Sequence, residues 1–157
     1  MEPNNDSLQV DEVHPNLSRF RKRLMEDQDL LTLTLKLHLA IEESLYKILA
    51  KLVRRPELLP DRLPFHHALA LTRALLPDNK LDGALAAALM LNGIRNRLAH
   101  QIEPDVDFLV RDFINAVKPM YADCGWDRLS PFEAAGTAGF YVWGMLEGIV
   151  HNYVPQA

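Results

Sequence analysis

Apolar side chains recur at helical spacing along most of this 157-residue chain. Between residues 30 and 53, one apolar stripe follows intervals of three or four residues: Leu37, Ile41, Leu45, Ile48 and Leu52. Within the same segment, residues 31–39 alternate leucine with threonine, lysine and histidine, as a strand would. Because no turn residue interrupts the segment and leucine favours helices, we predict one long helix over residues 30–53.

Prolines and turn residues divide the remainder into further helices. Pro56, Pro60 and Pro64 predict a loop, and Ser130 before Pro131 has the order of a capped helix start. The other helices are expected over residues 16–27, 64–76, 80–100, 105–121 and 130–153. The predicted fold is therefore all-α: a single-domain helical bundle of about five to six helices with a long early helix.

This bundle should occupy residues 16–154, behind a flexible polar tail over residues 1–15. A hydrophobic content of 48% and a charged content of 24% are ordinary for globular proteins. The single cysteine, Cys124, excludes an internal disulfide and a cysteine-based metal cluster. The sequence shows no signal peptide and no apolar stretch of bilayer length, so we expect a cytoplasmic protein without membrane contact.

The distribution of charged residues suggests one candidate surface for binding phosphates. The formal net charge of −4 argues against indiscriminate coating of nucleic acid but leaves room for a local basic cleft. The densest basic run lies in the expected first helix: Arg19, Arg21, Lys22 and Arg23. This run is either a solvated helix face or a rim that contacts phosphates.

The candidate chemistry lies in residues 94–100, where several polar side chains close an apolar helix. Arg95 supplies a permanent planar cation suited to phosphate oxygens. His100 supplies a side chain that exchanges protons near neutral pH. A cation and a proton shuttle are a minimal set for cleaving RNA without a metal or another cofactor.

The hexapeptide Arg95-Asn96-Arg97-Leu98-Ala99-His100 resembles the motif of the HEPN superfamily, in which an arginine and a polar residue precede a histidine. Residues 38–45 resemble the long early helix of such domains. The resemblance implies an all-α bundle that forms a homodimer and brings two motifs into one cleft. It further implies a metal-independent endoribonuclease of the toxin or defence type, with Arg95, Asn96 and His100 at the site, and an antitoxin or regulatory protein as a partner.

Residues 91–100 also resemble the mannitol operon repressor family, an all-α group with a similar turn. That resemblance implies a non-catalytic regulator that binds protein or nucleic acid. The motif would then brace a helix junction.

Helical geometry predicts a contact between two chains. One face of the motif helix should pack in the core: Ala84, Ala87, Leu91, Ile94 and Leu98. A nearly opposite face begins with leucine and ends in polar residues: Leu85, Leu89, Asn92, Asn96 and His100. A helix that is apolar on two sides is buried on two sides, so we predict that this second face meets another subunit.

Arg95 and His100 project about 140° apart on an ideal helix. They can converge only if the helix ends at His100 or if a second chain contributes. Alternatively, Arg95 could pair with a carboxylate such as Glu103. His100 could be a cation placed favourably at the helix C-terminus, the negative end of the helix dipole.

Four further residues have open roles. Asn96 could be a buried amide that fixes the helix end, and Arg97 either a salt-bridged surface residue or a second phosphate ligand. His38 and Glu42, four residues apart, share a helix face. Glu42 could hold the His38 tautomer in support of a catalytic site, or the two could form an ion pair inside the bundle.

Overall fold

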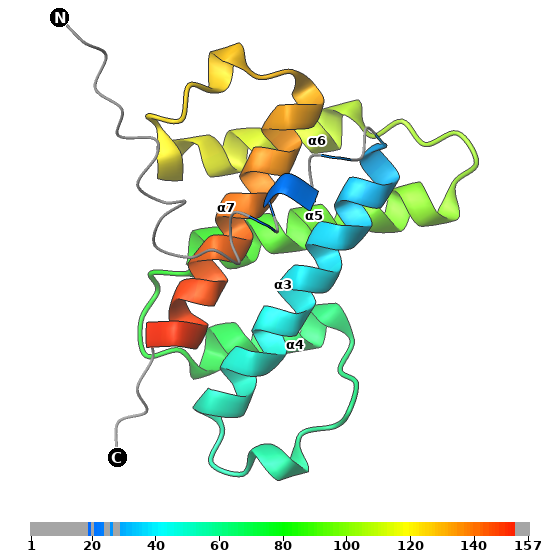
Figure 1. The fold of residues 1–157 in the computed structure, drawn as a ribbon. Coiled ribbons are helices and arrows are strands. Elements are labelled where there is room, and N and C mark those ends of the chain that lie inside the picture. Colours follow the sequence, from blue (N-terminus) through cyan, green and yellow to red (C-terminus); the bar gives the residue numbers. More distant parts are fainter. Residues whose placement is uncertain (1–18, 20, 24–25, 27–28, 153–157) are drawn as a thin grey trace, which may run out of the picture.

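The computed structural model describes residues 19, 21–23, 26 and 29–152. These residues form α-helices joined by short 3-10 helices and loops, and no strand occurs among them. The chain is therefore an all-α helical bundle, as the hydrophobic pattern predicts (Figure 1). The tail expected over residues 1–15 and most of the helix expected over residues 16–27 lie outside the described residues.

The long helix predicted over residues 30–53 is observed as α3 (Leu30–Leu52). Its first turn is capped by Asp29, whose carboxylate accepts hydrogen bonds from the backbone amide and the hydroxyl of Thr32 at 2.9 and 2.7 Å. These bonds stabilise the charged carboxylate and lower the pKa of Asp29 below its ordinary value. The predicted stripe points into the core, with Leu37, Ile41 and Leu45 buried.

The later helices also follow the sequence pattern. They are α4 (Phe65–Leu75), α5 (Asp82–His100), α6 (Asp107–Val117) and α7 (Pro131–Asn152), with 3-10 helices over Pro56–Leu58, Lys118–Tyr121 and Trp126–Arg128. The helix predicted over residues 105–121 tightens into a 3-10 turn at Lys118, because Pro119 has no amide hydrogen for a helical bond. A reciprocal cap opens α7: the Ser130 amide donates to Glu133 and the Glu133 amide donates to the Ser130 hydroxyl.

Helices α3 and α7 lie side by side, and α5 passes behind both of them (Figure 1). Helices α3 and α7 pack closely at Gly139 of α7, where an added Cβ would lie 2.3 Å from Cδ1 of Leu37 in α3. Glycine is therefore required by the space at this crossing. No described helix is apolar and long enough to cross a membrane.

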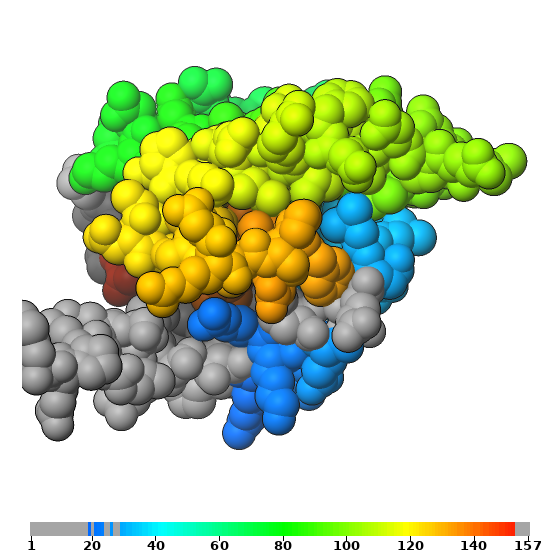
Figure 2. Space-filling model, turned by 90° about the horizontal axis from the view of Figure 1, so that it is seen from above, coloured from blue at the N-terminus to red at the C-terminus, as the bar shows by residue number. Residues whose placement is uncertain are grey.

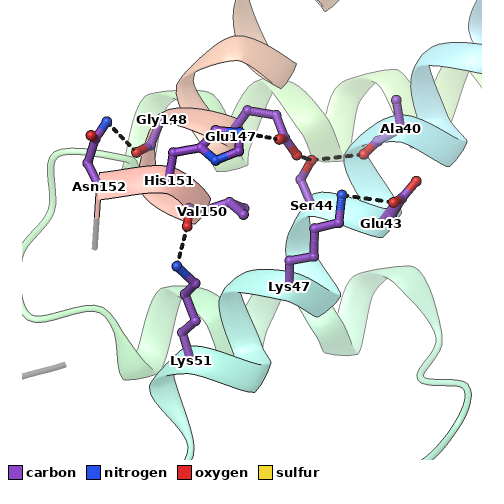
Figure 3. A network of polar contacts seen from close by, with 10 residues as sticks. All are labelled: Ala40, Glu43, Ser44, Lys47, Lys51, Glu147, Gly148, Val150, His151 and Asn152. Atoms are coloured by element: carbon purple, nitrogen blue, oxygen red, sulfur yellow. Dashed lines mark hydrogen bonds and ion pairs between the residues drawn. The ribbon is translucent and has the colours of Figure 1, made fainter. Parts of the chain in front are cut away.

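A polar network joins the second half of α3 to the end of α7 (Figure 3). Oγ of the buried Ser44 lies 2.5 Å from Oε1 of Glu147, and Nε2 of His151 lies 3.4 Å from Oε2 of the same carboxylate. The Lys51 amine donates to the carbonyl of Val150. These contacts satisfy a carboxylate that would otherwise be costly to bury.

Candidate functional site

Helix α5 presents the motif as its last turn. His100 is the final helical residue, and Gln101 continues in an extended conformation. The predicted core face is confirmed for Ala84, Ala87, Leu91 and Ile94, which are buried, while Leu98 is partly buried.

Arg95 is half-buried, and no carboxylate lies within ion-pair distance of it among the described residues. The expected alternative of a pair with Glu103 is therefore wrong. The Nη1 of Arg95 donates to Oδ1 of the neighbouring Asn96 at 2.9 Å. Its Nε is buried without any hydrogen-bond partner. An unsatisfied buried donor is energetically unfavourable, so Nε would gain from an acceptor supplied by a ligand.

His38 of α3 contacts the motif helix α5 through a hydrogen bond. Nε2 of its buried ring lies 3.0 Å from Oδ1 of Asn92, and the ring stacks on Phe65 with centroids 4.4 Å apart. Because Oδ1 of an amide can only accept, Nε2 donates this hydrogen bond and a neutral His38 has its free lone pair on Nδ1.

The pKa of His38 lies below the ordinary histidine value of 6.5, chiefly because burial disfavours the charged ring. The hydrogen bond to Asn92 and the charge of Glu42 oppose this shift, whereas the positive charge of Arg95 adds to it. His38 is therefore neutral at pH 7 and lies within electrostatic reach of Arg95. The ion pair considered for His38 and Glu42 is wrong: Asn92 is the hydrogen-bond partner, and Glu42 acts only through its charge.

Arg97 and His100 lie on the solvent side of the helix end. Nη1 of Arg97 donates to the Asp105 carbonyl at 3.4 Å, and its guanidinium lies 5.5 Å from the centroid of Phe108. Arg97 is therefore bound to a carbonyl and an aromatic ring rather than to a carboxylate. His100 is exposed and makes no hydrogen bond or ion pair with any described residue.

One chain thus assembles only part of the predicted site. The fold brings His38, Asn92, Arg95 and Asn96 together, and no contact joins Arg95 to His100. Helical projection places Asn92 on the second face of α5 and does not predict its bond to His38. No sequence spacing signals this bond, because the two residues are 54 positions apart.

The second apolar face of α5 is smaller than predicted. Leu85 is buried inside the monomer, because α5 is enclosed by α3, α4, α6 and α7. The expectation that Leu85 meets another subunit is therefore wrong. Leu89, one turn later, remains 49% exposed.

The arginine run in the expected first helix is exposed at each described position, namely Arg19, Arg21, Lys22 and Arg23. Arg21 lies over the ring of Phe140 in α7, at 5.9 Å from its centroid. Within the described ranges, no three histidine, cysteine, aspartate or glutamate side chains are placed to hold a metal ion.

Comparison of the chain with models of protein families, with curated proteins and with solved structures gave no match. The chain is an all-α bundle in which the half-buried Arg95 has no carboxylate within ion-pair distance among the described residues.

Proposed function

We propose that this protein is a metal-independent endoribonuclease of the HEPN type, acting as a homodimer with a composite site. The observation that carries the proposal is Arg95, a half-buried cation whose Nε is unpartnered and which has no carboxylate within ion-pair distance among the described residues. A phosphate group offers oxygens that a guanidinium can bind in a forked manner, and it supplies the missing negative charge.

Two chains are needed because Arg95 and His100 project about 140° apart on α5. A two-fold axis near the helix end would place His100 of one chain opposite Arg95 of the other. The half-exposed Leu89 lies on the same side of α5 as His100 and would be covered in such a contact.

In this dimer, one His100 accepts the proton of the ribose 2′-hydroxyl, whose oxygen attacks the adjacent phosphorus. The other His100 donates a proton to the departing 5′-oxygen, so that the products are a 2′,3′-cyclic phosphate and a 5′-hydroxyl. Arg95 of each chain stabilises the added charge of the pentacoordinate intermediate. Asn96, bound to Nη1 of Arg95, orients the guanidinium.

The test is incubation with mixed RNA in the presence of a chelator, with identification of the product ends. Wild type should cleave and yield cyclic phosphates, His100→Ala should be inactive, and Arg95→Lys should be impaired because an ammonium lacks the forked geometry. His67→Ala, at an exposed histidine of α4, is the matched control and should cleave normally. Loss of cleavage on chelation alone would refute the metal-free reaction.

The dimer has its own test in light scattering over a concentration series. Leu89→Glu should shift the protein toward monomer, because it places an unpaired charge in the contact. A wild-type protein that remains monomeric at micromolar concentration contradicts the composite site.

A non-catalytic regulator of the mannitol operon repressor type is the second candidate. The bond between His38 and Asn92 favours it, since this bond ties α3 to the motif helix as a structural brace would. If the His100→Ala and Arg95→Lys variants are both unfolded, and wild type cleaves no RNA, then the motif is a structural brace and the second candidate function, the regulator, is supported.

A further inference from the structure

The side-chain amide of Asn92 has a partner for its oxygen but none for its nitrogen. Oδ1 faces Nε2 of His38 at 3.0 Å, across the contact between α3 and α5. Because the oxygen and the nitrogen of an amide lie on opposite sides of its carbon, this bond directs Nδ2 away from the His38 ring. No described residue accepts a hydrogen bond from Nδ2. Two donor hydrogens of Asn92 are therefore left without a protein acceptor.

The amide of Asn96 is held in the same sense. It lies one turn further along α5, on the same face as Asn92. Oδ1 of Asn96 accepts a hydrogen bond from Nη1 of Arg95 at 2.9 Å, and no described residue accepts one from its Nδ2. Both amide oxygens are thus used by donors of the protein, while both amide nitrogens remain available. With the guanidinium of Arg95, this part of α5 offers hydrogen-bond donors only, which is the set that an anion requires.

These donors can be reached by a ligand. Figure 2 shows the yellow-green part of the chain around the end of α5, which projects beyond the light-blue start of α3. Asn96 and His100 are exposed there, and Asn92 lies only about 6 Å from Asn96 along the helix axis. The buried side-chain nitrogen and oxygen atoms that lack a partner among the described residues are Oγ1 of Thr72 and Nε of Arg95. Nδ2 of Asn92 is therefore unpartnered but in contact with solvent.

The charges around this cluster favour a singly charged anion. Both the positive charge of Arg95 and the negative charge of Glu42 act on His38. No ion pair joins Glu42 to Arg95, so the guanidinium remains open to a ligand, but the carboxylate repels excess negative charge. An internal phosphodiester carries one negative charge, whereas a phosphate monoester carries about 1.5–2 near pH 7. The cluster is thus better suited to a phosphate between two nucleosides than to a phosphorylated end.

We infer that Asn92 is a further binding residue for the phosphodiester of the substrate; the inference rests on the proposed function. Nδ2 of Asn92 donates to one nonbridging oxygen while the guanidinium of Arg95 binds the other. His38 is a positioning residue, because its Nε2 holds the amide so that the nitrogen, and not the oxygen, meets the phosphate. The buried histidine therefore acts without transferring a proton.

The test uses three tetranucleotides with 2′-O-methyl riboses, which attack by a 2′-hydroxyl cannot cleave. The first has one central phosphodiester among uncharged methylphosphonate linkages, the second has methylphosphonates only, and the third adds a 5′-phosphate monoester to the second. Calorimetry should show that wild type binds the first most tightly. Asn92→Ala should reduce the preference for the first over the second about tenfold, as expected for a hydrogen bond to a charged group. Asn115→Ala, at an exposed asparagine of α6, is the matched control and should bind as wild type.

The role of His38 is tested by a pair of substitutions that need no change at Asn92. His38→Gln should keep the preference, because its amide nitrogen can donate to Oδ1 of Asn92 in place of Nε2. His38→Leu should lose as much of the preference as Asn92→Ala, because the amide is then free to turn. A residue that only braced the two helices would change the affinity for all three ligands equally.

The inference is overturned if wild type binds the phosphodiester ligand no better than the other two. It is equally overturned if Asn92→Ala or His38→Leu retains the full preference. A wild type whose preference depends on Asn92 but which cleaves no RNA refutes the proposed nuclease and leaves the phosphodiester site intact. Cleavage by wild type, together with an unchanged preference in Asn92→Ala, refutes the role of Asn92 alone.

Discussion

Replacing Arg95 by methionine should raise the free energy of unfolding, although it removes a charged residue with a hydrogen-bonded neighbour. The buried and unpartnered Nε is the reason, because an unsatisfied buried donor costs about 1–3 kcal/mol. Against this gain stands the bond from Nη1 to Asn96, which is exposed and worth about 0.5–1.5 kcal/mol. Arginine and methionine have similar helix propensities, so the net stabilisation should be about 1 kcal/mol.

The assay is urea and thermal unfolding of wild type and variant at equal protein concentration. For a chain of this length, 1 kcal/mol corresponds to a rise in Tm of roughly 2–4 °C. Arg97→Met is the matched control, two residues further along the same helix. It loses the bond to the Asp105 carbonyl and the contact with the Phe108 ring, and should therefore destabilise the protein by about 1 kcal/mol.

The opposite order of stabilities would refute this reasoning. If Arg95→Met lowers the unfolding free energy by more than Arg97→Met does, then Arg95 supports the fold and its charge is satisfied in solution. Arg95 would then have no need of a phosphate ligand. If Arg95→Met is more stable and no longer binds RNA, the charge is kept for function at a cost in stability.

Three further outcomes are expected from unfolding measurements. Gly139→Ala should lower the free energy of unfolding by about 1–3 kcal/mol, because the added Cβ would lie 2.3 Å from Leu37. Gly144→Ala in the same helix should raise it by about 0.5–1 kcal/mol, because the added Cβ meets no atom within 4 Å and alanine favours the helix. Because the pKa of His38 is lower in the folded chain, the free energy of unfolding should be highest above pH 6.5 and should fall as the pH drops through the pKa of the folded state. The loss is about 1.4 kcal/mol for each unit by which the pKa is lowered. His38→Gln should flatten this pH dependence. Ser130→Ala should cost about 1 kcal/mol by removing the cap of α7, and an unchanged Tm would contradict that cap.

Helical periodicity was sufficient to predict the elements of the fold. The stripe through Leu37 and Ile41 requires a helix that buries one face, and α3 has that form. The alternating leucines of residues 31–39 did not form a strand: Leu33 and Leu37 are buried, whereas Leu39 is 62% exposed, so these leucines lie on different sides of α3. Ser130 marked a helix start through its backbone chemistry, which is local and therefore readable. Pro119 lies inside the helix predicted over residues 105–121, and the observed α6 ends before it, at Val117.

The site could be predicted only in part, because its contacts join helices that are distant in sequence. Asn92 bonds to His38 across 54 positions, and no spacing rule reports such a pair. Leu85 is buried because several helices surround α5, and the projection of a single helix carries no information about its neighbours. The sequence could identify Arg95 as a candidate cation, but only the structure shows that its Nε is buried without a partner and that no carboxylate lies within ion-pair distance among the described residues.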